Sequence, residues 1–409
     1  MAKERLFNRG RFTFVGAGIF GKTVVDTKKL NDEWSRTRLN FGVKVGTNTQ
    51  FLNAEFMHSD KVKKVKLFGS DGEQFEVNLS DTGNEDVINR VADFSKITVD
   101  LETDKEIKDQ YYSLFYKIRN HENKEEQTQD DIDKIKEYRE QIKELSANIK
   151  QFVHMKDVIQ YINDNQEVIN KNKIRVTGDV KVNYYNGKAR LNFIPKNFKL
   201  LVADTDTIEE LRVNIDIFFD RESIDNDTKE QKMYINGYVG DVVKKAEKLF
   251  PTQIVFDYSR VDMENAQQKA LVDYMTAFFV EDVKSKKKLY KLPVICSVVN
   301  GAEVVEFSMD TLTDRQKTAI ALGLAKLDDY KPKGNIFGDR VTFTKLMNAD
   351  LALSPEGTVE AMDLDDLFAY LPSDDSDKKV DEVKEEKPKE EESKSKEPNQ
   401  DEIMRALFG

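Results

Sequence analysis

Short runs of alternating apolar and polar residues, separated by glycine turns, constrain the fold of this chain more than any other feature. Residues 11–15, 38–45, 62–68 and 74–79 all show this period of two, with turns at 46–48 and 69–72. Side chains alternate between the two faces of a strand, so the runs predict an antiparallel β meander. Apolar residues at helical spacing predict a helix over 84–94 to close it.

Strand patterning returns in the second half of the chain. Residues 174–182 and 189–193 flank Asn186-Gly187, which is typical of a β-hairpin with a two-residue turn. Further strands are expected at 211–219, 232–239, 252–258, 291–299 and 340–346, with helices at 263–279 and 313–327. Five short strands with a helix between them are typical of the oligonucleotide-binding (OB) fold. The predicted fold class is therefore α+β, mainly β, with two small OB-like β-barrels, one formed by 1–100 with 171–205 and the other by 206–350.

Residues 101–170 interrupt this pattern. They contain almost no glycine or proline and are dense in Glu and Lys, and their apolar residues recur at spacings of three and four: Ile132, Ile135, Tyr138, Ile142, Leu145 and Ile149. Such a narrow stripe is typical of an amphipathic helix that packs on one partner. We expect it to pair with a helix around 111–118 as a helical hairpin or coiled-coil insertion.

The net charge of −11 is concentrated at the C-terminus. Residues 351–409 hold 18 acidic and 8 basic side chains, whereas 1–350 hold 57 and 56. Within that body, residues 1–70 carry 14 basic against 6 acidic side chains, and 174–202 carry 6 basic against Asp179 alone. Two cationic stretches in a nearly neutral body predict a surface that binds a phosphate backbone.

Aromatic residues interleave with these charges. Lysine and arginine follow a nucleic-acid backbone while exposed rings stack on bases, which is how single-strand binders work without reading sequence. Trp34, Tyr184 and Tyr185 are expected in loops as stacking residues, whereas Phe12, Phe14 and Phe41 have the alternative of facing the core. The predicted nucleic-acid-binding residues are Arg9, Arg11, Lys22, Trp34, Arg36, Arg38, Lys44, Lys64, Lys66, Arg175, Lys181, Tyr184, Tyr185, Arg190 and Lys196.

Gly16-Ala-Gly-Ile-Phe-Gly-Lys22-Thr23 matches the pattern of a phosphate-binding P-loop and also that of a dinucleotide-binding turn. A true P-loop needs a helix that begins at Lys22-Thr23. The β-branched Thr23, Val24 and Val25 favour an extended chain instead. The glycines then serve to bend a coiled strand, and a P-loop nucleotide-hydrolysing replication protein remains the alternative.

Little in the composition favours an enzyme or a metal site. Cys296 is the only cysteine and there are three histidines, too few for the usual structural zinc site. Carboxylate pairs such as Asp216/Asp220 arise by chance among 75 acidic residues. We predict no catalytic residues, metal or cofactor. The polar N-terminus and the absence of a long apolar stretch predict a cytoplasmic protein, in the host cytoplasm if viral, with no membrane partner.

The C-terminal tail is the most specific feature. Residues 351–400 are predicted to be an acidic linker, which is Lys/Glu/Pro/Ser-rich and disordered from about residue 372. The tail ends in acidic Asp401 and Glu402 and in an apolar helical face of Ile403, Met404, Leu407 and Phe408. This tail resembles the C-terminal tails of bacterial and bacteriophage single-stranded-DNA-binding proteins, although Gly409 follows the phenylalanine and the usual proline is absent.

The resemblance implies a non-enzymatic, sequence-tolerant single-stranded-DNA-binding protein of a phage-like replication or recombination system. In that family the tail recruits replication and repair enzymes and competes with DNA for the basic groove. A homo-oligomer is compatible with this expectation. A structural or scaffolding protein of a virus particle, assembled through the helical insertion, is the second alternative.

Overall fold

The computed structural model describes residues 5–372 except 125, 146–147, 186–187, 202–206, 260, 282, 306–313, 322–325, 327–335 and 347–357. The predicted tail tip at 401–409, and the linker from 373 onward, lie outside the described residues. The chain divides into two compact units, Met1–Asn300 with Thr342–Pro372, and Gly301–Val341 with Ser373–Gly409.

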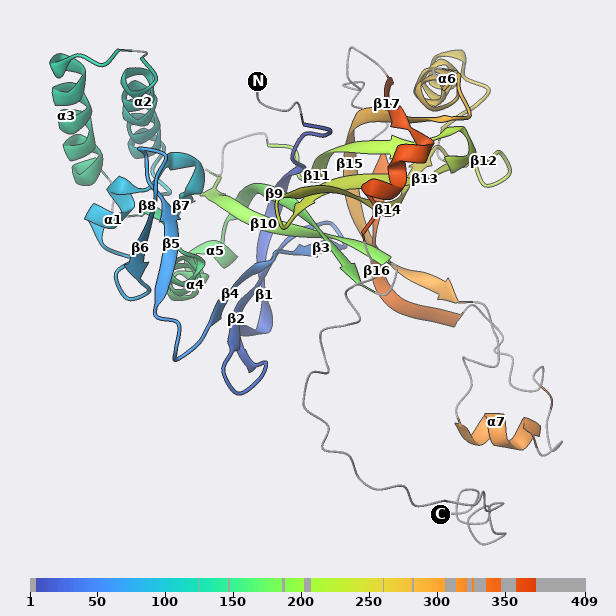
Figure 1. Ribbon diagram of the computed structural model, residues 1–409, viewed down its shortest axis with the longest axis horizontal. Helices are drawn as coiled ribbons and strands as arrows, with labels where there is room; N and C mark the ends of the chain where they lie inside the picture. Colours follow the sequence, from blue (N-terminus) through green and yellow to red (C-terminus); the bar gives the residue numbers. More distant parts are fainter. Residues whose placement is uncertain are drawn as a thin grey trace, which may run out of the picture. The chain divides into compact units, whose positions relative to one another are not determined.

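The chain forms mostly strands, and its helices lie between groups of strands along the sequence (Figure 1). The first strands are β1 (Arg11–Lys29), β2 (Ser35–Val45), β3 (Asn48–Phe51), β4 (Ala54–His58), β5 (Lys64–Phe68), β6 (Gln74–Asn78), β7 (Ile97–Asp100), β8 (Ile149–Phe152), β9 (Lys173–Tyr185) and β10 (Lys188–Leu200). The later strands are β11 (Glu210–Phe219), β12 (Ile224–Asp227), β13 (Lys232–Val243), β14 (Ala246–Asp257), β15 (Lys288–Val305), β16 (Ile336–Leu346) and β17 (Val359–Asp363). The α-helices are α1 (Glu85–Arg90), α2 (Lys105–Glu122), α3 (Gln129–Leu145), α4 (Met155–Asp164), α5 (Gln166–Asn170), α6 (Ala266–Val280) and α7 (Asp314–Ala321), and the 3₁₀ helices are η1 (Asp93–Ser95), η2 (Arg221–Ser223) and η5 (Leu364–Ala369).

The protein is mixed α/β and mainly strand, with 46% strand and 28% helix, which confirms the predicted class. The two OB-like barrels are not confirmed, because the described residues form no closed barrel. Fifteen strands join one sheet in the order β12-β13-β14-β16-β15-β11-β1-β9-β10-β7-β8, with β17 on β15, β2 on β1, and β3 and β4 on β2. Strands of 1–100 and of 206–350 thus share a sheet instead of closing separately.

Strand β1 joins the two halves of this sheet. Its first residues, Arg11 to Val15, lie between β11 and β9, whereas from Ala17 onward it pairs with β2. Gly16 lies at the change of neighbour, and a Cβ atom there would stand 2.4 Å from the carbonyl oxygen of Lys44. Only glycine fits so close an approach of two backbones. The glycine-rich segment is therefore extended, as its β-branched residues predict.

The β9–β10 hairpin follows the predicted pattern. Tyr185 pairs with Lys188, so two residues connect the strands, although these two are outside the described part of the chain. A bulge between Pro195 and Asn197 contains Lys196. Bulges increase the local twist of a strand, and this one lies where β10 turns toward β7.

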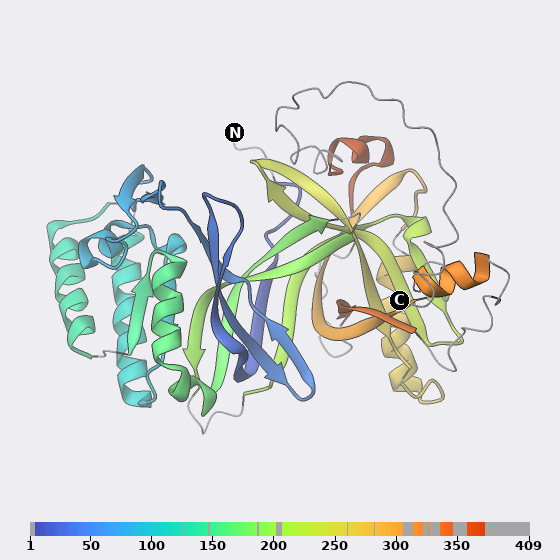
Figure 2. The ribbon, with the colours of Figure 1, turned by 90° about the horizontal axis from the view of Figure 1, so that it is seen from below.

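The 101–170 segment contains the expected pair of helices, α2 and α3, followed by β8, α4 and α5. Helices α2 and α3 lie side by side in both views (Figures 1 and 2). The predicted helical stripe ends too late, however, because Ile149 belongs to β8 and pairs with Asp100 of β7. Helices α4 and α5 follow, and they bury Val158, Ile162 and Ile169 in the main core.

The main core confirms the inward reading of three strand phenylalanines. Phe12, Phe14 and Phe41 are at most 2% exposed. The rings of Phe12 and Phe14 pack on Phe193 of β10, with centroids 5.5 and 4.8 Å from it. Apolar positions of the two cationic sequence stretches therefore share one core, which leaves their polar positions for the outer faces.

Candidate nucleic-acid interface

The outer face of β2 carries a row of cations. Along this strand Thr37, Leu39, Phe41 and Val43 are buried, while Arg36 and Arg38 are half-buried and Lys44 is exposed. The period of two that predicts the strand also places these three cations on one face.

Strands β3 and β4 extend this face on the free side of β2. Phe51 lies opposite Gly42, and Glu55 lies opposite Arg38. Phe51 is 46% exposed, which is unusual for a phenylalanine in a strand next to a well-formed core. Phe51 is not among the predicted binding residues. The sequence does contain a signal for its position: Gly46, with a φ of +57°, closes a tight hairpin, and this turn fixes the β2–β3 register that places Phe51 opposite Gly42.

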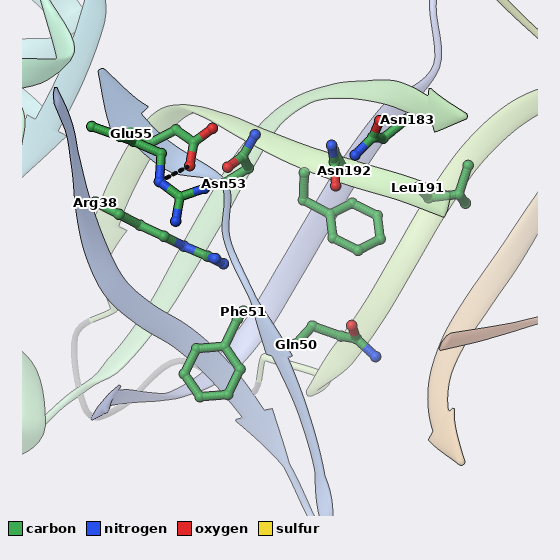
Figure 3. A pocket seen from close by; sticks show the side chains of 10 residues that line it. Arg38, Gln50, Phe51, Asn53, Glu55, Asn183, Leu191 and Asn192 are labelled. Carbon is green, nitrogen blue, oxygen red and sulfur yellow. Dashed lines mark ion pairs between the residues drawn. The ribbon is translucent and has the colours of Figure 1, made fainter. Parts of the chain in front are cut away.

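A cavity of about 330 Å³ opens between this face and the β9–β10 hairpin. The amide of Asn53 in the β3–β4 connection donates to the carbonyl of Phe193 at 2.8 Å and ties the two walls together. Figure 3 shows the Arg38 side chain extending toward the middle of this space, with Phe51 at its border. The residues that line it, called the groove below, are Arg36, Arg38, Gln50, Phe51, Asn53, Glu55, Asn183, Leu191, Asn192 and Phe193.

The charges of the groove are incompletely paired. Arg36 Nε lies 3.7 Å from Glu55 Oε2, a long and half-exposed ion pair (Figure 3). Arg38 Nε is buried without a hydrogen-bond partner. Buried donors are nearly always satisfied, so the protein does not hold the Arg38 guanidinium at Nε, and the charge of this group, which extends into the cavity, is one that a phosphate would neutralise. With amide side chains on both walls and a ring at the rim, the groove can hydrogen-bond phosphates or base edges and stack a base.

The structure brings only some of the predicted binding residues to this groove. Arg36 and Arg38 line it, Lys44 lies on the same face of β2, and Arg190 is exposed opposite groove residue Asn183. Trp34 is half-buried in the loop two residues before Arg36, and its amide donates to Asn31 Oδ1 at 2.8 Å.

Other predicted residues have structural partners elsewhere. Lys181 Nζ pairs with Asp241 of β13 at 2.9 Å, and Arg11 pairs with Asp179 of β9 at 3.3 Å. Tyr184 is in a strand, not a loop as expected, and its half-buried ring packs 5.7 Å from that of Phe250. The Arg11 pair joins two adjacent strands, β1 and β9, whereas Lys181 and Tyr184 link β9 to β13 and β14, which are not its neighbours in the sheet.

The remaining predicted residues are spread over several elements. Arg9 borders a different cavity beside Asp216 and Pro293. Lys22 is exposed near the end of β1, Arg175 is half-buried in β9, and Lys196 is in the β10 bulge. Lys64 and Lys66 are on β5, in a separate two-stranded sheet with β6. Tyr185 ends β9, and its side chain is outside the described part.

The glycine-rich match at residues 16–23 lies wholly inside β1. The helix N-terminus that a P-loop directs at phosphate is therefore not formed at Lys22-Thr23. Among the described residues, no three His, Cys, Asp or Glu side chains gather as metal ligands would. None of the described helices is long and apolar enough to cross a membrane.

Comparison of the chain with known protein families, curated proteins and solved structures finds no match. The groove is therefore interpreted from its own residues alone.

Proposed function

We propose that this protein binds single-stranded DNA with little sequence preference, as part of a phage-like replication or recombination system. The observation that carries the proposal is the groove: half-buried arginines, one with an unpaired Nε, lie beside the exposed ring of Phe51. Cations that follow a backbone and rings that stack on bases are the two components of sequence-tolerant single-strand binding.

The proposal favours single strands because stacking requires an unpaired base. A duplex keeps its bases stacked on one another, so Phe51 would gain nothing from it and only the cations would attract it. The amides of Asn53, Asn183 and Asn192 both donate and accept, so they contact any base edge or phosphate without discrimination.

The acidic tail enters the proposal as a partner-recruiting segment. Unit 1 ends at Pro372, next to Leu371, whose carbonyl accepts a 2.9 Å hydrogen bond from Lys248 Nζ on β14. A tail of the composition of 373–409 is negatively charged overall and competes with DNA for a cationic groove. Removal of 373–409 is expected to tighten DNA binding several-fold at low salt, and an unchanged affinity would remove the competition from the proposal.

The test uses Trp34, the only tryptophan of the chain, as a probe two residues from Arg36. The intact protein is titrated with single-stranded oligothymidine and with a duplex of the same length, each at low and at physiological salt. We expect tryptophan fluorescence to change with the single strand, with an affinity that falls as salt rises. Equal affinity for duplex and single strand, or no binding of either, would refute the proposal.

A further inference from the structure

The small sheet of β5 and β6 carries a pair of exposed aromatic rings outside the groove. Phe68, the last residue of β5, is 43% exposed, and Phe94 in η1 is 76% exposed. Their ring centroids are 6.3 Å apart and their planes are inclined at 51°. The amide of Ala92 donates to the carbonyl of Phe68 at 2.9 Å and holds η1 at the end of β5. Backbone contacts thus keep both rings at the surface.

Neither ring belongs to the core of this sheet. Along β5, Val65 and Leu67 face inward, and the buried cluster consists of Leu67, Val91 and Val153. Lys64, Lys66 and Phe68 alternate with them and are exposed. Two large rings that add little to the core, on the face that also carries cations, have the character of a binding surface.

The approach to the ring pair is strongly cationic. Residues 61–66 read Lys-Val-Lys-Lys-Val-Lys. Lys66 pairs with Glu76 at 3.7 Å and Lys61 pairs with Glu33, while Lys63 and Lys64 form no ion pair with the described residues. This composition attracts a polyanion and does not resemble the aliphatic surface that a protein partner would bury.

The Lys61–Glu33 ion pair connects this approach to the groove region. Glu33 precedes Trp34, in the loop that leads into β2, and the chain runs from β4 of the groove face through 59–63 into β5. On the far side of Phe68 the turn carries Asp71 and Glu73, whose charges repel phosphate. The cationic path therefore ends at the two rings.

We propose that Phe68 and Phe94 form a second base-stacking site, which binds the end of a single DNA strand that leaves the groove over Lys63 and Lys64. The inference rests on the proposed function and extends it: the binding site has two stacking positions, Phe51 and the Phe68–Phe94 pair, joined by the lysines of residues 61–66. A strand long enough to reach both positions gains stacking energy that a short strand lacks.

The test compares a short oligothymidine of about 6 nucleotides with a long one of about 20, which lie near the lower limit and beyond the upper limit of the site sizes of about 4–16 nucleotides known for single-strand binders. The variant is Phe68→Ala/Phe94→Ala, and Phe368→Ala, an 80% exposed phenylalanine in η5, is the matched control. We expect the double variant to bind the long strand about tenfold or more weakly, because it loses the stacking of at least one base. Its affinity for the short strand, and the affinities of the control, should match those of the wild type.

The outcomes separate this inference from the proposed function. Wild-type affinity of the double variant for the long strand would overturn the second site and leave the groove intact, and the rings would then be assigned to a protein partner. Failure of the wild type to bind either strand, with Trp34 fluorescence unchanged, would refute the proposed function and this inference with it. Should the double variant not fold, Phe94→Ala alone gives the same test at the more exposed ring.

Discussion

Two groups of charged residues in this protein differ in how completely they are paired. At the corner between β7 and α2, Asp100 and Lys108 are buried and lie 3.5 Å apart. Lys108 Nζ also donates to the carbonyl of Leu200, and Tyr112 donates to Asp100 Oδ2 at 3.1 Å. Burial raises the pKa of Asp100 and lowers that of Lys108, and the attraction between the two opposes both shifts.

The groove arginines are in the opposite state. Arg36 has one distant partner, and Arg38 Nε has none although it is buried. A buried charge that is held by several partners is unavailable to a ligand, whereas a half-buried and underpaired charge retains hydrogen-bonding capacity. This difference in pairing distinguishes the buried Asp100–Lys108 cluster, which is structural, from the groove, which is a candidate binding site.

The largest expected effect breaks the structural cluster. Lys108→Met leaves the Asp100 carboxylate buried without its cation, which is expected to cost about 3–5 kcal/mol of the free energy of unfolding. Urea denaturation measures this loss. Lys134→Met is the control: it removes an exposed ion pair whose Nζ and Asp130 Oδ2 atoms are 2.6 Å apart, and it should cost far less than Lys108→Met. Equal effects of the two variants would show that burial does not set the strength of these pairs.

The second prediction concerns the groove cations. Charge reversal of Arg36, Arg38 and Lys44 to Glu should weaken single-strand binding severely, and denaturant melts must show that the variant is still folded at the temperature of the titration, because Arg36 pairs with Glu55 and Arg38 lies opposite it. If each contacts one phosphate, the slope of log affinity against log salt should become shallower by about 2. Titrations at several salt concentrations give the slope.

A matched triple reversal keeps the same change of net charge away from the groove. It uses three exposed lysines: Lys105, Lys136 and Lys229. An identical loss of affinity in this control and in the groove variant would mean that overall charge, and not the groove, drives binding.

The third prediction isolates stacking from charge. Phe51→Ala removes the ring at the rim of the groove and should weaken single-strand binding by roughly 1–3 kcal/mol without altering its salt dependence. Met57→Ala is the control, because Met57 is 52% exposed on neighbouring β4 and does not line the groove. Equal losses in both variants would indicate that the whole apolar surface, and not the ring, matters.

The smallest effect concerns a helix cap beside the groove strands. His154 Nδ1 accepts the amide of Lys156 at 3.2 Å at the start of α4, so the ring must be neutral at this nitrogen. Burial lowers the pKa of His154 from its usual 6.5. As the pH falls, the unfolded chain therefore takes up the proton before the folded chain does. The stability that neutral His154 contributes to the fold is complete above pH 6.5 and is lost as the pH falls through the lowered pKa.

Loss of the cap is worth about 1 kcal/mol. His154→Asn retains an acceptor at the cap and cannot titrate, so its free energy of unfolding should depend less on pH between 7.5 and 5 than that of the wild type. Denaturant melts across this range check the prediction. An unchanged pH dependence in the variant would assign the titration to another group.

Local patterns predicted the elements better than their assembly. The hairpin around Asn186-Gly187 follows from turn chemistry that acts over a few residues. Ile149 fits a helical period, yet it pairs with Asp100 of β7, because a partner strand 49 residues away stabilises an extended conformation there. The two OB-like barrels are not confirmed, and β1 instead pairs with β11 on one edge, a partner that no local signal specifies.

The candidate site shows the same division. Arg36 and Arg38 were identified because charge and alternation are properties of the sequence. Phe51 does not stand out in the sequence, and Tyr184, expected in a loop, is in a strand with its half-buried ring beside Phe250. Whether a ring is exposed depends on which distant element covers it, and a strand sequence contains no record of that element.

The sequence by itself therefore determined where the longer strands, the β9–β10 turn and the helical pair form, and it separated a nearly neutral body with cationic stretches from an acidic tail, because these depend on side chains close together in the chain. The tertiary structure alone decided that β2–β4 and the β9–β10 hairpin form the two walls of one groove, and that Arg38 there has an unpaired Nε. The physical reason is that strand register and packing between residues more than a hundred positions apart arise from the whole core and not from any segment of it.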